Sequence, residues 1–219
     1  MQITDYIIND IKPLRLEDTI GQAQEFFTQT TYSHVPVTDG TTFLGCLAEN
    51  DVHCHSAQQP LEGVRHMMEV FFVREDTNWL NLLESFGQNQ TNLLPVLRED
   101  GRYMGYYEVE DVLNYFNTTP FIHEQGAIIL LERGIHDYSF SEISQIVEAQ
   151  GGKILGAFIS KIENDVVQIS LKVSGSGGLN EVFRALRRYG YSITSSHSED
   201  SFLKDLRERS AYLEKYLNI

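Results

Sequence analysis

The sequence has little of what marks an exported or membrane-bound protein. Its 219 residues include two cysteines, Cys46 and Cys54, and the amino-terminal residues do not have the basic and apolar layout of a signal peptide. No apolar run approaches the roughly 18 residues that a membrane-spanning helix needs. We therefore expect a reduced, cytoplasmic protein that does not enter a membrane.

Basic residues are also scarce, above all in the first half of the chain. The whole chain has 17 lysine and arginine residues against 31 acidic ones, a formal net charge of −14. Residues 1–123 hold 6 of the basic and 18 of the acidic residues, which gives that half a net charge of −12. A surface of this sign repels phosphate backbones and anionic headgroups. We expect neither nucleic acid nor a membrane as a partner.

A catalytic constellation is missing as well. Serine, histidine and aspartate are common, but no nucleophile motif or metal-ligand spacing organises them. The densest group of possible metal ligands lies in residues 51–55, Asp-Val-His-Cys-His. If a helix begins at Asp51, these side chains point in different directions, because helical neighbours lie three or four residues apart. We expect neither an enzyme nor a metal site.

What the sequence does contain is an internal repeat. Three landmarks of the first copy return in the second, namely Val35-Pro36-Val37 as Leu94-Pro95-Val96, Gly45 as Gly105, and Asp51-Val52 as Asp111-Val112. The prolines are 59 positions apart, and the glycines and aspartates are 60 apart. Three landmarks with one slip of a single residue are poorly explained by chance. Two short units of this kind pack against each other, and the seam between them is a natural ligand cleft.

Each copy predicts a helix, a strand, a turn, a second strand and a short helix. Apolar residues at helical spacing open each copy, and those of the second follow 59 positions after the first: Ile20, Ala23 and Phe27, then Trp79, Leu82 and Phe86. An Asp-Gly turn separates the two strands, at residues 39–40 and 100–101. Asp51 and Asp111 are expected to cap the short helices that follow.

From Gly126 the pattern changes to that of a second domain. A strand is predicted at 127–132, a helix at 139–150, a hairpin at 153–162 and 166–173, a helix at 180–189 and a strand at 191–195. This βαββαβ order is the ferredoxin-like split unit. Residues 201–219 place Phe202, Leu206, Leu213 and Leu217 near one helical face, which predicts a terminal amphipathic helix. The fold class is therefore α/β (α+β), with domains at 1–120 (copies of about 1–60 and 61–120) and 124–197, and a helix at 198–219.

The first domain resembles a pair of cystathionine-beta-synthase-type (CBS) domains, often called a Bateman module. The resemblance depends on residues 34–37 (HVPV), 45–51 (GCLAEND), 93–96 (LLPV) and 105–111 (GYYEVED). The second is similar to an ACT domain, because a Gly-Gly pair stands between its first helix and second strand. A CBS pair followed by an ACT domain is the layout of bacterial acetoin-utilisation regulatory proteins. This layout implies a non-enzymatic, homodimeric regulatory sensor, and its effector protein is unknown.

The CBS resemblance also implies a set of ligand-binding positions. In adenosine-binding members, the motif Gly-x-x-Thr/Ser-x-x-Asp offers an aspartate to the ribose and a hydroxyl to the phosphate region, and the preceding strand reads the adenine edge. The ribose positions here are Asp51 and Asp111, and the hydroxyl positions are Ala48 and Glu108. The adenine positions are Ser33, His34 and Val35 in one copy and Asn92, Leu93 and Leu94 in the other. Alternatively, the two aspartates serve only as helix caps.

Ala48 and Glu108 disfavour a phosphate, because Ala48 removes a donor and Glu108 adds a like charge. We therefore expect a ligand that is neutral or cationic beyond the ribose, such as S-adenosylmethionine, or a metal-bound nucleotide such as Mg-ATP, with AMP as a further adenosyl candidate. The alternative is a ligand-free dimeric scaffold with decayed nucleotide sites, filled by side chains such as those of Tyr106, Tyr107 and Glu108.

For the ACT-like half, the resemblance places a ligand at the loop after the first strand. The loop positions are Gly134, Ile135, His136 and Asp137. Tyr138 stands where a glycine is expected in the family, so the usual amino-acid site is expected to be blocked. A small ligand could still bind the loop backbone at a subunit interface.

Overall fold

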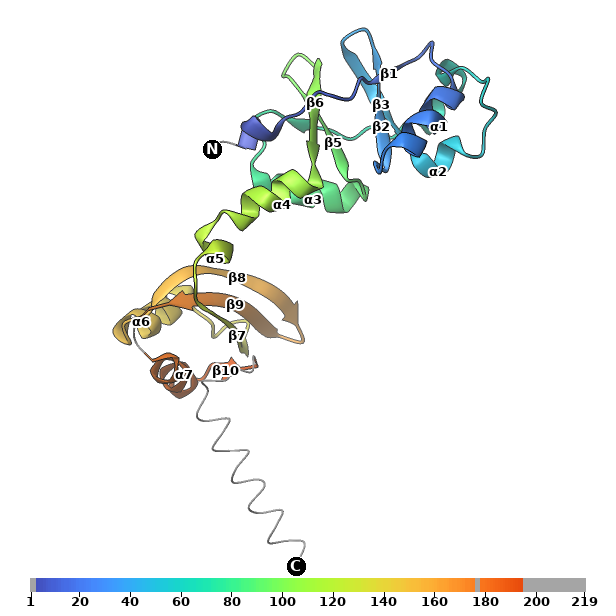
Figure 1. The fold of residues 1–219 in the computed structure, drawn as a ribbon. Coiled ribbons are helices and arrows are strands. Elements are labelled where there is room, and N and C mark those ends of the chain that lie inside the picture. The colour runs from blue at the N-terminus through green and yellow to red at the C-terminus, as the bar shows by residue number, and fades with distance from the viewer. Residues whose placement is uncertain (1–2, 176–177, 195–219) are drawn as a thin grey trace, which may run out of the picture. The chain divides into compact units, whose positions relative to one another are not determined.

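The computed structural model describes residues 3–175 and 178–194 of the chain (Figure 1). The chain divides into two compact units, one ending at Asn117 and the other beginning at Thr118. Helices and strands alternate in both, which confirms the predicted mixed fold class. The terminal helix expected at 198–219 lies outside the described residues.

The first unit contains the predicted repeat as two similar sets of elements. The first set is η1 (Ile3–Tyr6), β1 (Leu14–Arg15), α1 (Ile20–Gln29), β2 (His34–Asp39), β3 (Thr42–Ala48) and α2 (Glu49–Val52). The second is η2 (Leu61–Met67), β4 (Val73–Arg74), α3 (Trp79–Asn89), β5 (Leu93–Leu97), β6 (Tyr103–Glu108) and α4 (Val109–Asn117). Each set builds a three-stranded sheet, in the orders β1-β2-β3 and β4-β5-β6.

The apolar residues at helical spacing form the cores of these two copies. Ile20, Ala23 and Phe27 of α1 are buried against β2 and β3, and Leu82 and Phe86 of α3 are buried in the second copy. The remaining member, Trp79, stacks on Phe116 of α4 with ring centroids 4.9 Å apart. The 3.6-residue period thus buries the face that the sequence predicted.

The two copies are interlocked by the segments that precede their first strands. Ile8, from the first copy, pairs with Tyr106 of β6 through backbone hydrogen bonds of 3.0 and 2.9 Å. Glu69, 61 positions later, pairs in the same way with Cys46 of β3 at 2.9 and 2.8 Å. In Figure 1 the blue N-terminal segment begins beside β6 before it runs to β1. Each copy therefore extends the sheet of the other.

These crossings explain why glycine stands at the repeat landmarks Gly45 and Gly105. Both have a φ of +155°, and a Cβ at Gly105 would lie 2.2 Å from the carbonyl oxygen of Ile8. A Cβ at Gly45 would lie 3.0 Å from the carbonyl oxygen of Glu69. Because the obstructing atoms are backbone atoms, a side chain at either position would displace the crossing segment.

The short helices begin earlier than predicted, so the expectation that Asp51 and Asp111 cap them is wrong. The helix α2 begins at Glu49 after Ala48, and α4 begins at Val109, which puts both aspartates at the third helical position. The backbone N–H of Glu49 donates to the carbonyl of Ser33 at 2.9 Å, and that of Val109 to the carbonyl of Asn92 at 3.2 Å. These tertiary hydrogen bonds turn the chain into a helix directly after each strand. A carboxylate in the first turn still stabilises the helix, because its negative charge interacts favourably with the positive end of the helix dipole.

The second unit has the predicted ferredoxin-like topology. Its elements are α5 (Pro120–His123), β7 (Ala127–Gly134), α6 (Phe140–Ala149), β8 (Lys153–Glu163), β9 (Val166–Ser174), α7 (Leu179–Arg188) and β10 (Ser192–Ile193). The sheet order is β10-β7-β9-β8, and every neighbouring pair is antiparallel. The last strand is shorter than the predicted 191–195. The predicted hairpin turn is made by Asn164 and Asp165, both with positive φ.

One face of this sheet packs on α6 and α7. Ile129 and Leu131 of β7 and Ile169 of β9 are fully buried with Ile143 of α6 and Phe183 of α7 in one apolar core. Because strand side chains alternate, the residues between these face the opposite side of the sheet. On that side the short helix α5 makes contact, with the ring of Phe121 against Phe158 and the Lys172 ammonium donating to the carbonyl of Ile122 at 3.0 Å.

We expect Gly105→Ala to destabilise the first unit by roughly 1–3 kcal/mol, because the new methyl group would push the crossing segment off β6. The measurement is urea unfolding followed by the fluorescence of Trp79, which is the single tryptophan of the chain and lies in this unit. Gly87→Ala is the matched control, because nothing lies within 4 Å of a Cβ there, in the middle of α3. It should be neutral or slightly stabilising. A Gly105→Ala variant as stable as the wild type would contradict the account of the crossing.

Candidate functional site

The two copies of the first unit meet at a pair of equivalent polar residues, Ser33 and Asn92. The backbone N–H of Ser33 donates to the Asn92 side-chain oxygen at 2.8 Å, and the backbone N–H of Asn92 donates to the Ser33 hydroxyl at 3.2 Å. The Asn92 amide group also donates to the carbonyl of Thr31 at 2.8 Å. Each residue directly precedes the central strand of its sheet, so this exchange fixes β2 and β5 relative to each other.

A cleft of about 400 Å³ lies beside this contact, on the side of the first copy. Its residues come from the start of β2, the junction of β3 and α2, the crossing segment and the end of α3: Ser33, His34, Ala48, Glu49, Asn50, Glu69, Gln88, Asn89 and Gln90. The helix α3 ends here because Gln90 adopts a left-handed conformation with a φ of 48°. Both copies therefore contribute to this space, which we call the first cleft and whose volume suits a small ligand.

The first cleft is polar and acidic. Among the nine residues that line it there is no lysine or arginine, whereas Glu49 and Glu69 bring two carboxyl groups. Asn50, Gln88, Asn89 and Gln90 add amide groups that both donate and accept hydrogen bonds. An anionic ligand would find donors here but no counter-charge.

His34 forms the buried wall of the first cleft, with 6% of its surface exposed. Its Nδ1 lies 2.8 Å from the Ser33 hydroxyl, and its Nε2 lies 3.8 Å from a carboxylate oxygen of Glu69. Burial lowers the pKa of His34, although the carboxylates of Glu69 and Asp51 act in the opposite direction. The ring is therefore neutral at pH 7 and offers one donor and one acceptor.

In the second copy, the position equivalent to the first cleft holds a hydrogen-bonded network that includes Glu108. The Tyr32 hydroxyl donates to a carboxylate oxygen of Glu108 and lies 3.3 Å from the hydroxyl of Tyr106. Tyr106 in turn donates to Asp10 at 2.5 Å. Burial and the neighbouring Glu108 raise the pKa of Tyr32 to about 12, so this phenol keeps its proton at physiological pH. Burial together with the carboxylates of Glu108 and Glu110 raises the pKa of Asp111.

The predicted ligand-binding residues are spread over different environments. Ser33, His34 and Ala48 line the first cleft. Val35, Leu93 and Leu94 are fully buried, so these three have only backbone groups to offer a ligand. Asp51 and Asp111 are half-buried in the first turns of their helices. The fully buried side chain of Tyr107 belongs to the apolar core of the second copy, whereas Tyr106 joins the network.

The sequence did not predict several residues that line the first cleft or join the Tyr32–Glu108 network. Glu69 and the end of α3 line the first cleft from the other copy, so spacing along the chain does not connect them with Ser33. Tyr32 reaches a partner 76 residues away. One signal was available for Tyr32, since its equivalent 59 positions later is the much smaller Thr91.

In the second unit, backbone hydrogen bonds hold the predicted ligand loop, one within the loop and one to the turn between β8 and β9. The backbone N–H of Asp137 donates to the carbonyl of Gly134 at 2.9 Å, and the N–H of Ile135 donates to the carbonyl of Asp165 at 2.8 Å. Next to the loop, Arg133 and Glu142 form an ion pair of 2.7 Å. Glu142 also accepts a hydrogen bond of 2.9 Å from the hydroxyl of Tyr191. The charges at the base of the loop are thus paired within the domain.

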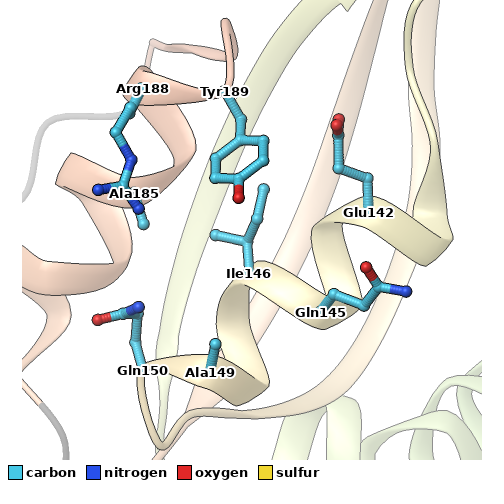
Figure 2. A pocket seen from close by; sticks show the side chains of 8 residues that line it. All are labelled: Glu142, Gln145, Ile146, Ala149, Gln150, Ala185, Arg188 and Tyr189. Carbon is cyan, nitrogen blue, oxygen red and sulfur yellow. The ribbon is translucent and has the colours of Figure 1, made fainter.

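Figure 2 shows a groove of about 240 Å³ between α6 and the end of α7, which the sequence did not predict. Its lining residues are Glu142, Gln145, Ile146, Ala149, Gln150, Ala185, Arg188 and Tyr189. The ring of Tyr189 lies beside Ile146, and the Arg188 guanidinium lies 5.7 Å from the centre of that ring. The lining is mixed in polarity and shares Glu142 with the Arg133 ion pair.

Within residues 3–175 and 178–194, histidine, cysteine, aspartate and glutamate side chains form no group of three or more that is placed to hold a metal ion. None of the helices described has both the length and the apolar character needed to cross a membrane.

Part of the first unit is similar to known proteins. Residues 64–118, which hold most of the second copy, match the model of the CBS domain family. The first copy repeats its elements in the same order. The chain is similar to an inosine-5'-monophosphate dehydrogenase of Methanocaldococcus jannaschii, 22% identical over 149 residues, which cover 67% of this chain and 30% of that enzyme. It therefore spans less than a third of this curated relative.

Solved structures with a similar fold include two CBS-domain proteins. One is a CBS domain pair/ACT domain protein from Thermotoga maritima, with a TM-score of 0.48, 21% identity, and coverage of 53% of this chain and 96% of that one. The other comprises the CBS domains of a transcriptional regulator from Streptococcus pneumoniae, with a TM-score of 0.46, 18% identity, and coverage of 52% and 98%.

We expect the free energy of unfolding of the first unit to decrease as the pH falls, and we expect His34 to cause part of this decrease. Because burial lowers the pKa of His34 below 6.5, the unfolded chain takes up a proton first as the pH falls. This contribution to stability is complete above about pH 6.5 and is lost as the pH falls towards the folded-state value. Urea unfolding followed by Trp79 fluorescence between pH 8 and 5 measures it.

The His34→Gln variant should show a flatter dependence over this range, whereas His66→Gln, at an exposed position of η2, should keep the wild-type slope. An unchanged slope in His34→Gln would contradict the assignment.

Proposed function

We propose that this protein is a non-enzymatic small-molecule sensor that binds an adenosyl-type metabolite in the first cleft. The observation that carries the proposal is the composite lining of this cleft, in which Ser33, His34 and Ala48 lie where the CBS resemblance implies adenosine contacts. Glu69 and the end of α3 complete the wall from the other copy, so a ligand would bridge both copies. A bridging ligand stabilises one arrangement of the pair over others, which is what a sensor requires.

The charges of the first cleft favour a ligand that is neutral or cationic beyond its ribose. Glu49 and Glu69 repel a phosphate, and two like charges about 4 Å apart cost about 1 kcal/mol even in water. The alanine at position 48 also leaves the hydroxyl position of the family motif without a donor. S-adenosylmethionine, which carries a positive sulfonium group, therefore suits the cleft better than AMP or metal-free ATP. Magnesium would relieve part of the repulsion in Mg-ATP.

We propose in addition that the second unit is an ACT-type module and that the protein acts as a homodimer. The supporting observations are the ferredoxin-like topology and the exposed apolar side chains of its sheet, among them Ile128, Phe158 and Ile162. Paired sheets would bury these side chains, and two-fold pairing is the commonest closed symmetry. Light scattering of the full chain at micromolar concentration tests this, and a stable monomer would contradict it.

A ligand-free interaction scaffold is the second candidate function. Two observations favour it, namely the Tyr32–Glu108 network and the loop from Gly134 to Asp137, whose backbone is hydrogen-bonded within the second unit. The two functions differ in their response to metabolites. A ligand at 100 times its dissociation constant adds about 2.7 kcal/mol of stability, whereas a scaffold gains nothing from any member of a nucleotide and amino-acid panel.

We expect calorimetric titration to show binding of S-adenosylmethionine that is tighter than that of AMP, and little binding of ATP without magnesium. In Glu69→Gln, AMP should bind about fivefold more tightly than in the wild type, because one repelling charge worth about 1 kcal/mol is removed. The backbone pairing of residue 69 with Cys46 is kept in this variant.

Glu62→Gln is the matched control, since Glu62 is an exposed acid of η2 that does not line the cleft. It should bind like the wild type. Tight binding of metal-free ATP, or equal effects of the two substitutions, would overturn the proposed ligand class.

A further inference from the structure

The repeat defines a second cleft, which is the position in the second copy that is equivalent to the first cleft. We propose that the phenol side chain of Tyr32 fills and closes this second cleft. The CBS pair of one chain then takes up a single metabolite, in the first cleft. This inference rests on the proposed function for the occupant of the first cleft, but the closure itself is a property of the chain alone.

The repeat defines where the second cleft lies. Positions that line the first cleft have equivalents 59 to 61 residues earlier or later: Ala48 corresponds to Glu108, Glu69 to Ile8, and Gln90 to Thr31. Tyr32 directly follows Thr31, and its side chain reaches Glu108. The Tyr32 phenol is therefore bonded to the residue that stands at the hydroxyl position of the family motif.

Tyr32 is held in this place on several sides. Its ring stacks on Phe26 of α1, with centroids 6.1 Å apart, and meets the edge of Tyr106, with centroids 5.8 Å apart. Its hydroxyl donates to Glu108, while the hydroxyl of Tyr106 donates to Asp10. Each of the two phenols thus donates a hydrogen bond to a carboxylate, and neither carboxylate is left without a donor. A ligand that enters would have to replace these contacts.

The first cleft lacks all four members of this network. The equivalents of Tyr32, Glu108, Tyr106 and Asp10 are Thr91, Ala48, Cys46 and Phe71. The Thr91 hydroxyl donates instead to the carbonyl of Leu93, at 2.7 Å. No side chain at these four positions around the first cleft is able to form a phenol–carboxylate pair. The same fold therefore gives one open and one closed cleft.

Binding stoichiometry tests the inference directly. Calorimetric titration of the full chain with S-adenosylmethionine should give one site per chain. In the double variant Tyr32→Thr/Glu108→Ala, which copies the residues of the first cleft, a second site should appear and the stoichiometry should rise to two. Two sites in the wild type, or a single site in the double variant with its fold intact by circular dichroism, would overturn the inference.

A second measurement needs no ligand, so it separates failure of this inference from failure of the proposed function. Tyr32→Phe and Glu108→Ala should each destabilise the first unit in urea unfolding followed by Trp79. Their double variant should lose no more than the worse single variant, because both remove the same hydrogen bond. Tyr107→Phe is the control, since its hydroxyl has no hydrogen-bond partner among the described residues, and its effect should add to that of Glu108→Ala. Additive effects of Tyr32→Phe and Glu108→Ala would overturn the closure.

Discussion

The structure of the first unit depends on the exchange of two backbone segments between its copies. Ile8 pairs with β6 and Glu69 pairs with β3, each through two hydrogen bonds. Such main-chain pairing tolerates any residue with a backbone N–H at the crossing position, but it requires a glycine on the strand that is crossed, at Gly45 and Gly105. The side chains of the crossing segments consequently lie against the strands of the other copy. That placement makes the first cleft composite and brings Asp10 to Tyr106.

This interlocking of the backbone also allows the two clefts to differ. With the backbone frame fixed by the crossings and by the Ser33–Asn92 exchange, the side chains at equivalent positions are free to differ. In the first copy they leave a space of about 400 Å³ with an acidic, amide-rich lining. In the second they form a chain of two phenols and two carboxylates. The two copies therefore share one backbone arrangement but have different side chains in their clefts.

Much of the fold was predictable because it follows from local signals. The apolar residues at helical spacing gave α1 and α3, the Asp-Gly pairs gave both hairpin turns, and the alternation after Gly126 gave the βαββαβ order. The errors arose where distant contacts decide the local structure. The short helices begin at Glu49 and Val109 because carbonyl groups of Ser33 and Asn92 accept their first amides, and no local pattern records that.

The candidate site was less predictable than the fold for the same reason. Motif positions named Ser33, His34 and Ala48, but Glu69 and Gln88 enter the first cleft from another copy of the repeat. A crystal structure of the full chain with S-adenosylmethionine tests the account most directly. We expect the ligand between Ser33 and Glu69 in the first cleft, with Tyr32 still bonded to Glu108. A ligand beside Asp111, with Tyr32 displaced, would contradict the account.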